Sequence, residues 1–399
     1  MHKKLLSIVL GAMLTLSAIV PVSAESDFLN DGIDSNYLDL GPIESYDNFD
    51  YCINENADAT VLVSQRGLLS DGLSASGLVG AANANLVPVY TMYGESSVYW
   101  NQIVTDDVYI IGGEDVVTKE LENELIDYGY NVKRLAGRDR YQTSYRVAEE
   151  INRLTDVDKV AIINGKNGEA YAVSIASAAI KNKMPVIVTD GKKLSYNLDS
   201  VKTYAIGGNV VISDSLVNKT NAIRLGGRNR FETNKKVINE FYPGCTRFTI
   251  LESDWIHRSL AVQAITADQP IVLASVKSDK SVLNGADELL FVYFEDLHPN
   301  IESSCLAGAA GKGVYNAYET LYKKLGDKRN DICYTYNPND NYVDKESLKR
   351  DYYIFNIDDF YYDYDYGYDM TSWDMNYLVN KKTNKIYSYS SDHVLRFVK

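Results

Sequence analysis

The stretch that decides the fold is Arg134-Leu135-Ala136-Gly137-Arg138-Asp139-Arg140-Tyr141-Gln142-Thr143, and it occurs twice. The second copy is Arg224-Leu225-Gly226-Gly227-Arg228-Asn229-Arg230-Phe231-Glu232-Thr233. Six of the ten positions are identical, and a seventh is aromatic in both copies. Because self-similarity of this kind is the sequence signature of repeat proteins, we expect the chain to contain copies of one structural unit.

The similarity continues upstream of this motif in the same register. Tyr109-Ile110-Ile111-Gly112-Gly113 pairs with Tyr204-Ala205-Ile206-Gly207-Gly208, and two earlier apolar runs also pair. These runs are Thr60–Val63 and Val87–Thr91 in the first copy, and Val160–Ile163 and Met184–Thr189 in the second. Short Val- and Ile-rich runs of this kind are typical of strands that are buried on both faces.

A third copy is eroded. It begins at Phe248, passes through Pro270-Ile271-Val272-Leu273 and Leu289-Leu290-Phe291-Val292, and reaches Cys305-Leu306-Ala307-Gly308. Cys305 then stands where the other copies have arginine, and the double glycine and the following arginines are missing.

Each copy is predicted to contain, in this order, a strand, a helix of small residues, two further strands and a second helix. The helices are expected near Leu73–Ala82 and Ala172–Ile180, where small side chains would allow close approach to a sheet. Strands that alternate with helices imply parallel pairing and right-handed crossovers. Gly137 and Gly227 are expected to supply the positive φ that the motif's turn needs.

These motifs resemble the type 2 cell-wall-binding repeat of clostridia and related bacteria, over about residues 57–322. The resemblance implies Rossmann-like units, three of which pack about a pseudo-threefold axis. It also implies non-covalent anchoring to an anionic secondary wall polymer, with a variable extra domain for the particular protein's task. The chain departs from the family in its first helix, which begins Asp71-Gly72-Leu73-Ser74, and in the missing arginines of the third copy.

We therefore predict an α/β fold of three Rossmann-like repeats with parallel sheets, followed by a small β-rich or α+β C-terminal domain. The predicted boundaries are 1–24 for a signal peptide, 25–56 for an N-terminal segment, 57–155, 156–243 and 244–325 for the three repeats, and 326–399 for the C-terminal module.

The N-terminal sequence predicts export. His2-Lys3-Lys4 precede the apolar run Leu5–Val20, and Ala24 ends a signal-peptidase site; an uncleaved membrane anchor is the alternative. No later stretch is long and apolar enough for a membrane helix, so after signal cleavage we expect no membrane partner. The net charge of −14 argues against a nucleic-acid partner. We expect a secreted protein at the cell wall or cell surface.

Six motif arginines are the candidate ligand-binding residues, because the guanidinium fork can hold phosphate oxygens and stays charged. They are Arg134, Arg138, Arg140, Arg224, Arg228 and Arg230. The alternative is that they tie the repeats together through neighbouring carboxylates. The Gly112-Gly113 and Gly207-Gly208 turns are interpreted as structural, since no dinucleotide or Walker pattern accompanies them.

Catalytic and metal-binding patterns are nearly absent from the sequence. The histidines after the signal region are scattered, and Cys305 with His298 is a weak nucleophile-and-base pair. We expect no catalytic residue, no metal and no cofactor. The four cysteines are interpreted as free thiols, with one bridge such as Cys305 to Cys333 as the alternative.

The C-terminal tail is rich in tyrosine. Asn376–Asn380 and Lys385–Tyr389 flank a turn and predict a β-hairpin. Upstream, the alternation from Tyr362 to Asp369 predicts a strand, and three roles stay open for it: a calcium loop, a tyrosine surface for sugars or a protein, or a plain sheet core.

We interpret the chain as a surface protein of a Gram-positive bacterium, anchored by its repeats to an anionic wall polymer. The tail would serve display or interaction, including contacts with other surface-layer proteins. The alternatives are a secreted wall-modifying enzyme and a structural component of a surface layer.

Overall fold

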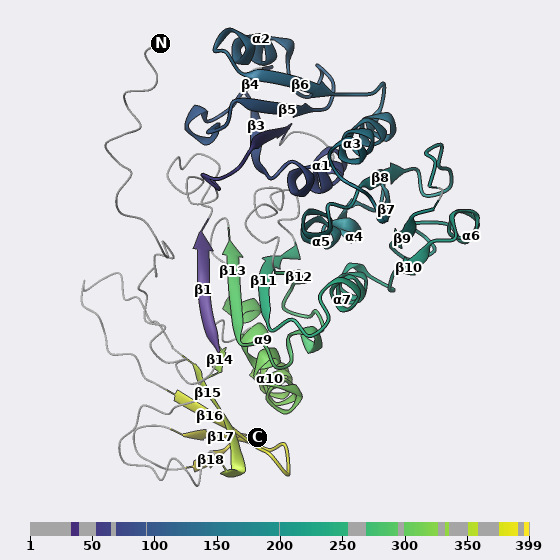
Figure 1. Ribbon diagram of the computed structural model, residues 1–399. Coiled ribbons are helices and arrows are strands. Elements are labelled where there is room, and N and C mark those ends of the chain that lie inside the picture. Colours follow the sequence, from purple (N-terminus) through teal and green to yellow (C-terminus); the bar gives the residue numbers. More distant parts are fainter. Residues whose placement is uncertain are drawn as a thin grey trace.

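Three mainly parallel sheets and one antiparallel sheet organise the part of the chain that the structure describes (Figure 1). The structure is a computed structural model. It describes residues 33–39, 53–64, 69–92, 94–198, 200–253, 269–293, 299–325, 332–334, 350–357, 375–389 and 395–398. The predicted signal peptide, His257, His298, His393 and the tyrosine run near Tyr362 lie outside these residues.

The first sheet has the strand order β4-β3-β2-β5-β6, in which only the β3–β4 pair is antiparallel. Its strands are β2 (Ala59–Ser64), β3 (Ala84–Met92), β4 (Glu95–Ser97), β5 (Asp107–Ile111) and β6 (Asn131–Leu135). The accompanying helices are α1 (Ser70–Ala81), the 3-10 turn η2 (Trp100–Gln102), α2 (Lys119–Asp127) and α3 (Arg140–Leu154).

The second sheet has the order β10-β9-β7-β8, and all its pairs are parallel. Its strands are β7 (Lys159–Asn164), β8 (Val186–Thr189), β9 (Lys202–Ile206) and β10 (Ile223–Leu225). Its helices are α4 (Glu169–Ala172), α5 (Ile175–Asn182), α6 (Asp214–Thr220) and α7 (Arg230–Phe241).

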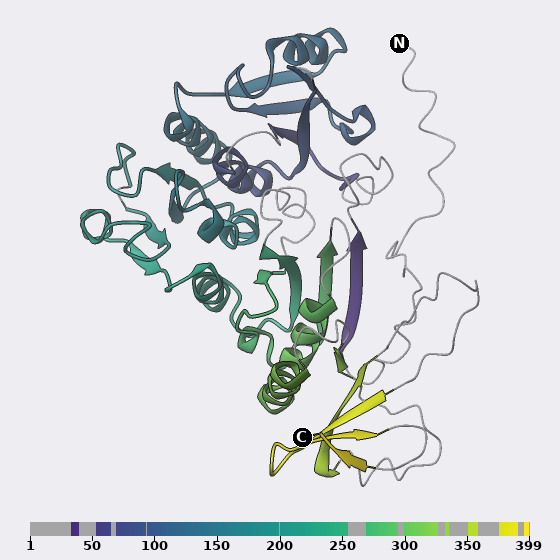
Figure 2. The same cartoon turned by 180° about the vertical axis from the view of Figure 1, so that it is seen from behind.

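The third sheet takes one strand from the N-terminal part of the chain. Its order is β1-β13-β11-β12, all parallel. The strands are β1 (Asp34–Asp39), β11 (Arg247–Glu252), β12 (Ile271–Ala274) and β13 (Glu288–Tyr293), with the 3-10 turn η4 at Ser281–Leu283 and the helices α9 (Pro299–Ala309) and α10 (Lys312–Leu325). Figures 1 and 2 both show β1 alongside β13 at the sheet edge.

All three sheets share one strand order once β4 is set aside. β1 occupies the place beside β13 that β6 takes beside β5 and β10 takes beside β9. One part of the predicted third copy is therefore wrong: Cys305–Gly308, aligned with the end of a strand, lies inside α9. The physical reason is that a strand from elsewhere in the chain already pairs with that edge of β13.

The parallel strands are buried, as their Val- and Ile-rich sequences predicted. All four residues of β8 and of β12 are buried, and one apolar cluster contains residues of all three sheets, among them Val63, Ile163 and Leu273. Figures 1 and 2 show α1 and α5 at the centre of the three sheets. The α/β fold with parallel sheets is thus confirmed.

The small residues of α1 allow it to approach α5 and the segment that joins α5 to β8. A Cβ atom on Gly77 would lie 2.3 Å from the carbonyl oxygen of Met184, and one on Gly80 would lie 2.0 Å from that of Ile180. These distances are far inside van der Waals contact, so glycine is required here for helix packing in spite of its low helix propensity.

The fourth sheet is antiparallel, with the order β14-β15-β16-β17-β18. Its strands are β14 (Ile332–Tyr334), β15 (Tyr352–Ile357), β16 (Met375–Asn380), β17 (Ile386–Tyr389) and β18 (Leu395–Phe397). The hairpin predicted around residues 381–384 is confirmed as β16–β17. The helix α10 covers this sheet, since Tyr318 and Leu321 share a core with Phe355 and Val379.

The cysteines that the structure describes fully are unbridged. Cys305 is a buried free thiol and Cys245 is a partly buried one, so the alternative of a Cys305–Cys333 disulfide is wrong. Burial raises the pKa of the Cys305 thiol to about 11, which leaves it protonated at neutral pH. None of the described helices has the length and apolar character needed to cross a bilayer.

Candidate functional site

The repeated motif forms a strand end, a tight turn and a helix start. Asp139 caps α3 by accepting a hydrogen bond from the backbone N–H of Gln142, and Asn229 caps α7 in the same way with Glu232. Thr143 Oγ1 accepts from the backbone N–H of Gly137 at 3.1 Å, and the second copy repeats this contact. These Asp, Asn and Thr side chains therefore fix the turn and the first helical turn.

Gly137 and Gly227 serve close packing, not backbone conformation. Neither has a positive φ, which corrects our expectation. A Cβ atom on Gly137 would lie 2.3 Å from Cβ of Gln142, so a side chain there would collide with the helix start. The positive φ values belong instead to Gly112 (106°) and Gly207 (121°), where the chain turns after β5 and β9.

Arg134 and Arg224 close those glycine turns. Arg134 Nε lies 2.9 Å from Glu122, and its Nη1 donates to the carbonyls of Gly112 and Val117. Its side chain is only 13% exposed. Arg224 donates in the same way to the carbonyl of Gly207 and pairs with Asp214. Because these guanidinium groups are occupied within their own units, their position suits a structural role.

Arg140 and Arg230 connect successive units. Arg140, the first residue of α3, donates to the carbonyl of Gly165, which directly follows β7 of the second sheet. Arg230, the first residue of α7, donates to the carbonyl of Ser253, which directly follows β11 of the third sheet. The same contact is thus made twice, from one unit to the next.

A second side chain strengthens each of these junctions. Ser144 Oγ accepts a hydrogen bond from the backbone N–H of Val188 on β8 at 3.0 Å. Asn234, at the matching position of α7, donates to the carbonyl of Ile271 and accepts from the N–H of Leu273 on β12. A polar side chain therefore satisfies backbone groups of the edge strand that no neighbouring strand pairs with.

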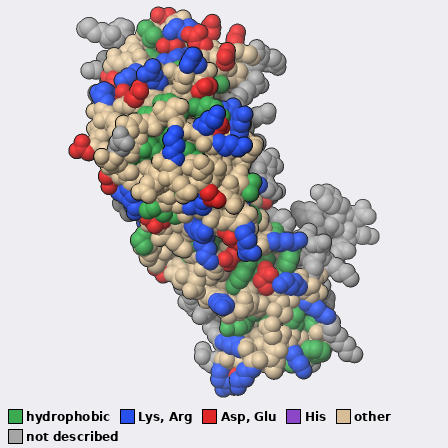
Figure 3. Space-filling model, turned by 90° about the vertical axis from the view of Figure 1, so that its right-hand side faces the viewer, with side chains coloured by type: hydrophobic (Ala, Val, Ile, Leu, Met, Phe, Trp, Pro, Cys, Tyr) green, Lys and Arg blue, Asp and Glu red, His purple; other side chains and the backbone are tan. Residues whose placement is uncertain are grey.

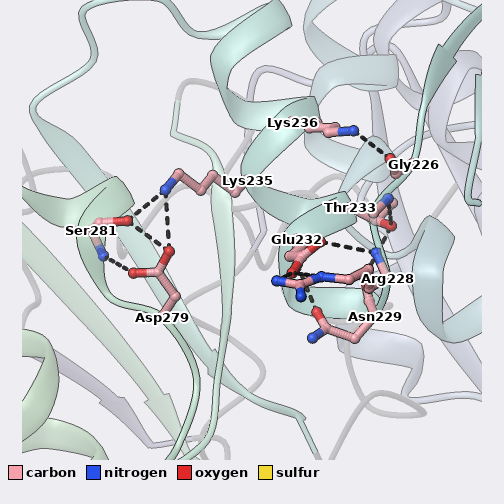
Figure 4. A network of polar contacts seen from close by, with 10 residues as sticks. Gly226, Arg228, Asn229, Glu232, Thr233, Lys235, Lys236, Asp279 and Ser281 are labelled. Carbon is pink, nitrogen blue, oxygen red and sulfur yellow. Dashed lines mark hydrogen bonds and ion pairs between the residues drawn. The ribbon is translucent and has the colours of Figure 1, made fainter.

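Arg138 and Arg228 are the exposed members of the motif. The Arg228 side chain is 90% exposed and pairs with Glu232 at 2.6 Å, as Figure 4 shows. Hydrogen bonding to Arg228 lowers the pKa of Glu232. Arg138 is exposed as well, and its neighbour at the matching position is the uncharged Gln142. These two guanidinium groups can meet a ligand without breaking the fold.

Two lysines of α7 make different contacts, Lys235 with the third unit and Lys236 with the turn after β10 of its own unit. Figure 4 shows Lys235 directed to Asp279 and Ser281, and Lys236 directed to the carbonyl of Gly226. Across the face shown in Figure 3, Lys and Arg side chains alternate with Asp and Glu and form no continuous basic patch. The predicted arginines therefore divide into several local environments.

A polar pocket of about 400 Å³ opens at the carboxyl edge of the second sheet. We call it the second-sheet pocket; its lining is Asn164, Lys166, Asn167, Asp190, Gly191, Lys192, Asn209, Val210, Val211 and Ser213. These residues lie at or after the ends of β7, β8 and β9, the three adjacent strands of that sheet. They are not among the residues that the motifs predicted, although their place after parallel strands is a signal that could have indicated them.

No group of three or more His, Cys, Asp or Glu side chains that could hold a metal ion occurs among the described residues. The possible calcium loop at Asp363–Asp369 and the Cys305–His298 pair both involve residues outside the described ones. Gly112 and Gly207 bind Arg134 and Arg224 through their carbonyls, which fits the structural interpretation of the double-glycine turns.

Residues 134–217 match the family model of Cell wall binding domain 2 (CWB2). The match begins at Arg134, contains α3 and the strands β7, β8 and β9, and ends in α6. It thus joins α3 to the sheet on which α3 docks. This part of the chain is similar to the type 2 cell-wall-binding domain.

Two proteins of Bacillus subtilis are similar in sequence to part of this chain. The amidase enhancer of Bacillus subtilis (strain 168) is 32% identical over 140 residues, which cover 34% of this chain and 19% of the enhancer. The N-acetylmuramoyl-L-alanine amidase LytC of the same strain is 28% identical over 194 residues, covering 46% of this chain and 38% of the amidase. The chain therefore spans less than two fifths of the length of either relative.

Among solved structures, Cwp8 from Clostridium difficile is similar in fold. It superposes with a TM-score of 0.57 at 24% sequence identity, covering 72% of this chain and 52% of Cwp8. At this identity the likeness concerns the fold alone.

Proposed function

We propose that this protein attaches non-covalently to the bacterial cell wall by binding an anionic secondary wall polymer. The observation that carries the proposal is the match of residues 134–217 to cell wall binding domain 2. The same inter-unit contact occurs from the first to the second and from the second to the third sheet, so the chain presents repeated units to a polymer that is itself a repeat.

Within this function the motif arginines divide into two groups. Arg138 and Arg228 are exposed and can present a planar fork to phosphate or carboxylate oxygens of the polymer. The other four hold the turns and the junctions that position these two. Glu232 competes with the ligand for Arg228. The ligand must replace this ion pair, which contributes little to stability because it is exposed to water.

The two ends of the chain have separate roles in this proposal. The signal peptide at residues 1–24 would export the chain to the surface of a Gram-positive bacterium. The C-terminal sheet with α10 would then serve display or contact with other surface-layer proteins.

The test is a sedimentation assay of the mature chain with purified cell walls, before and after chemical extraction of the phosphate-containing polymer. We expect retention on intact walls only. R138A/R228A should weaken retention without changing the thermal midpoint, because both side chains are exposed. R146A is the matched control, since Arg146 is also exposed and paired on α3 but lies outside the motif. Equal retention on intact and extracted walls would show that the anionic polymer is not the ligand.

A wall-modifying enzyme is the second candidate, because one relative is named as an N-acetylmuramoyl-L-alanine amidase. Zymography on wall substrate decides between the two: a cleared band at the size of the chain would favour the enzyme.

A further inference from the structure

The second-sheet pocket has the position at which open parallel sheets bind ligands. β7 lies between β8 and β9 in the sheet. After β7 the chain forms β8 on one side of β7, and it then forms β9 on the opposite side of β7. The crevice outside the carboxyl ends of strands at such a switch point accepts ligands in many α/β proteins. We propose that this pocket binds one negatively charged sugar unit, and this inference rests on the proposed attachment to an anionic wall polymer.

The floor of the pocket is fixed before any ligand arrives. Asn164 Nδ2 donates to the carbonyl of Val211 at 2.8 Å, and its Oδ1 accepts from the backbone N–H groups of Lys166 and Asn167. One side chain thus joins the loop after β7 to the loop after β9. Gly191, with φ of +79°, leaves room for this, because a Cβ atom there would lie 2.5 Å from Asn164 Nδ2.

Two cations and one carboxylate surround this floor. Lys166 and Lys192 are exposed at the pocket, and within the described residues neither ammonium group has a hydrogen bond or an ion pair. Asp190 faces the same space, and its Oδ1 accepts from the backbone N–H groups of Lys192 and Lys193. Two lysines against one carboxylate leave a net positive charge, which suits an anionic ligand.

The rim of the pocket suits a sugar ring. Val210 is 96% exposed at its edge, so an apolar side chain stands where a ligand can cover it. Asn167 and Asn209 are exposed beside it and offer amide groups for hydroxyls. A ring with an apolar face, several hydroxyls and a charged substituent matches this combination of groups.

The first sheet provides a natural contrast. There β3 continues into the β3–β4 hairpin, and Ser96 of β4 accepts a hydrogen bond from the backbone N–H of Thr118, the counterpart of Ser213. The loop after β5 also carries the exposed pair Glu114-Asp115 where the second copy has Asn209-Val210. The first sheet therefore has a covered edge and two negative charges at the place where the second sheet has an open, positively charged pocket.

The experiment measures binding of α-D-glucose 1-phosphate, D-glucuronate and neutral D-glucose to the folded mature chain by saturation-transfer NMR titration. The first two probes separate a phosphate from a carboxylate as the charged group. We expect at least one charged sugar to bind more tightly than glucose. K166A/K192A should weaken that binding about fivefold or more, as should N209E/V210D, which places the charges of the first sheet on the pocket rim.

The matched control is E114N/D115V on the first sheet, which should leave the titration unchanged because the β3–β4 hairpin still covers that edge. Thermal midpoints of all variants show that they are folded. Equal binding of glucose and the charged sugars, no binding of either charged sugar, or unchanged binding by K166A/K192A would overturn the pocket assignment. Sedimentation with walls is measured in parallel, so that a chain that binds walls but no charged sugar retains the attachment function and loses only this site.

Discussion

Neighbouring arginines of one short motif contact different partners. Arg134 is enclosed by Glu122 and the carbonyls of the glycine turn, whereas Arg138 extends into solvent beside Gln142. The difference follows from local structure: Arg134 lies on β6 beside β5, and Arg138 lies in the turn before α3. Under the proposed function, substitutions four residues apart should therefore affect wall binding and stability separately.

We expect R134A to destabilise the fold by about 2–4 kcal/mol, because it leaves the carbonyls of Gly112 and Val117 without this donor in a mostly buried place and leaves Glu122 paired with Lys119 alone. R138A should change the free energy of unfolding by less than about 0.5 kcal/mol. Chemical denaturation measures both. Equal effects of the two substitutions would contradict the division of the arginines.

Glu150 should make stability depend on pH. Its side chain is 5% exposed, and hydrogen bonds from Arg153, Lys133 and Tyr109 outweigh burial and lower its pKa to about 2. A carboxyl whose folded pKa is depressed stabilises the fold above its unfolded pKa, near 4.3, and this contribution is lost as pH falls toward 2. The expected loss is about 3 kcal/mol over that window.

Denaturant titrations at pH 7, 4 and 2.5 would measure this loss in the free energy of unfolding. The variant E150Q should be less stable than the wild type at pH 7, and the gap should narrow as the pH falls. A gap that stays constant over this range would assign the acid sensitivity to other carboxyl groups.

At the scale of elements, the apolar pattern of the sequence predicted the strands and helices, but the polar contacts between units could not be predicted from it. The strands of the first two copies, the small-residue helices and the β16–β17 hairpin were predictable because each depends on local periodicity and turn residues. The junctions were not, since Ser144 and Asn234 are polar residues on helices and only docking shows that they bind an edge strand. The pocket was missed for the same reason: its residues come from three separate loops.

The glycines of α1 give a test of helix docking. G77A places a methyl group 2.3 Å from the carbonyl oxygen of Met184, so α1 must move away from the segment that joins α5 to β8. We expect a loss of about 1–3 kcal/mol in the free energy of unfolding, although alanine is the better helix former. G113A is the control, because a Cβ atom there meets nothing within 4 Å. A stabilising G77A would show that helix propensity outweighs this close contact.

At the scale of the whole molecule, the third sheet depends on both ends of the repeat region. β1 pairs with β13 over six residue positions, from Asp34 with Glu288 to Asp39 with Tyr293. More than 240 residues separate the partners along the chain, so this pairing forms at a large cost in loop-closure entropy. It also ties the N-terminal segment to the sheet that precedes α9, α10 and the C-terminal sheet.

Removal of the chain up to Asp39 should therefore weaken the third sheet first. Without β1, one edge of β13 loses its backbone partners, and exposed N–H groups there exchange with solvent. Hydrogen exchange followed by mass spectrometry should show faster exchange over Glu288–Tyr293, with little change over Lys159–Asn164 of the second sheet. A synthetic peptide of residues 33–39, added in excess, should restore part of the protection by mass action, because it offers the same strand to the same edge. If exchange over Glu288–Tyr293 is the same with and without β1, or rises equally in β7, the strand makes no specific contribution to the stability of the third sheet.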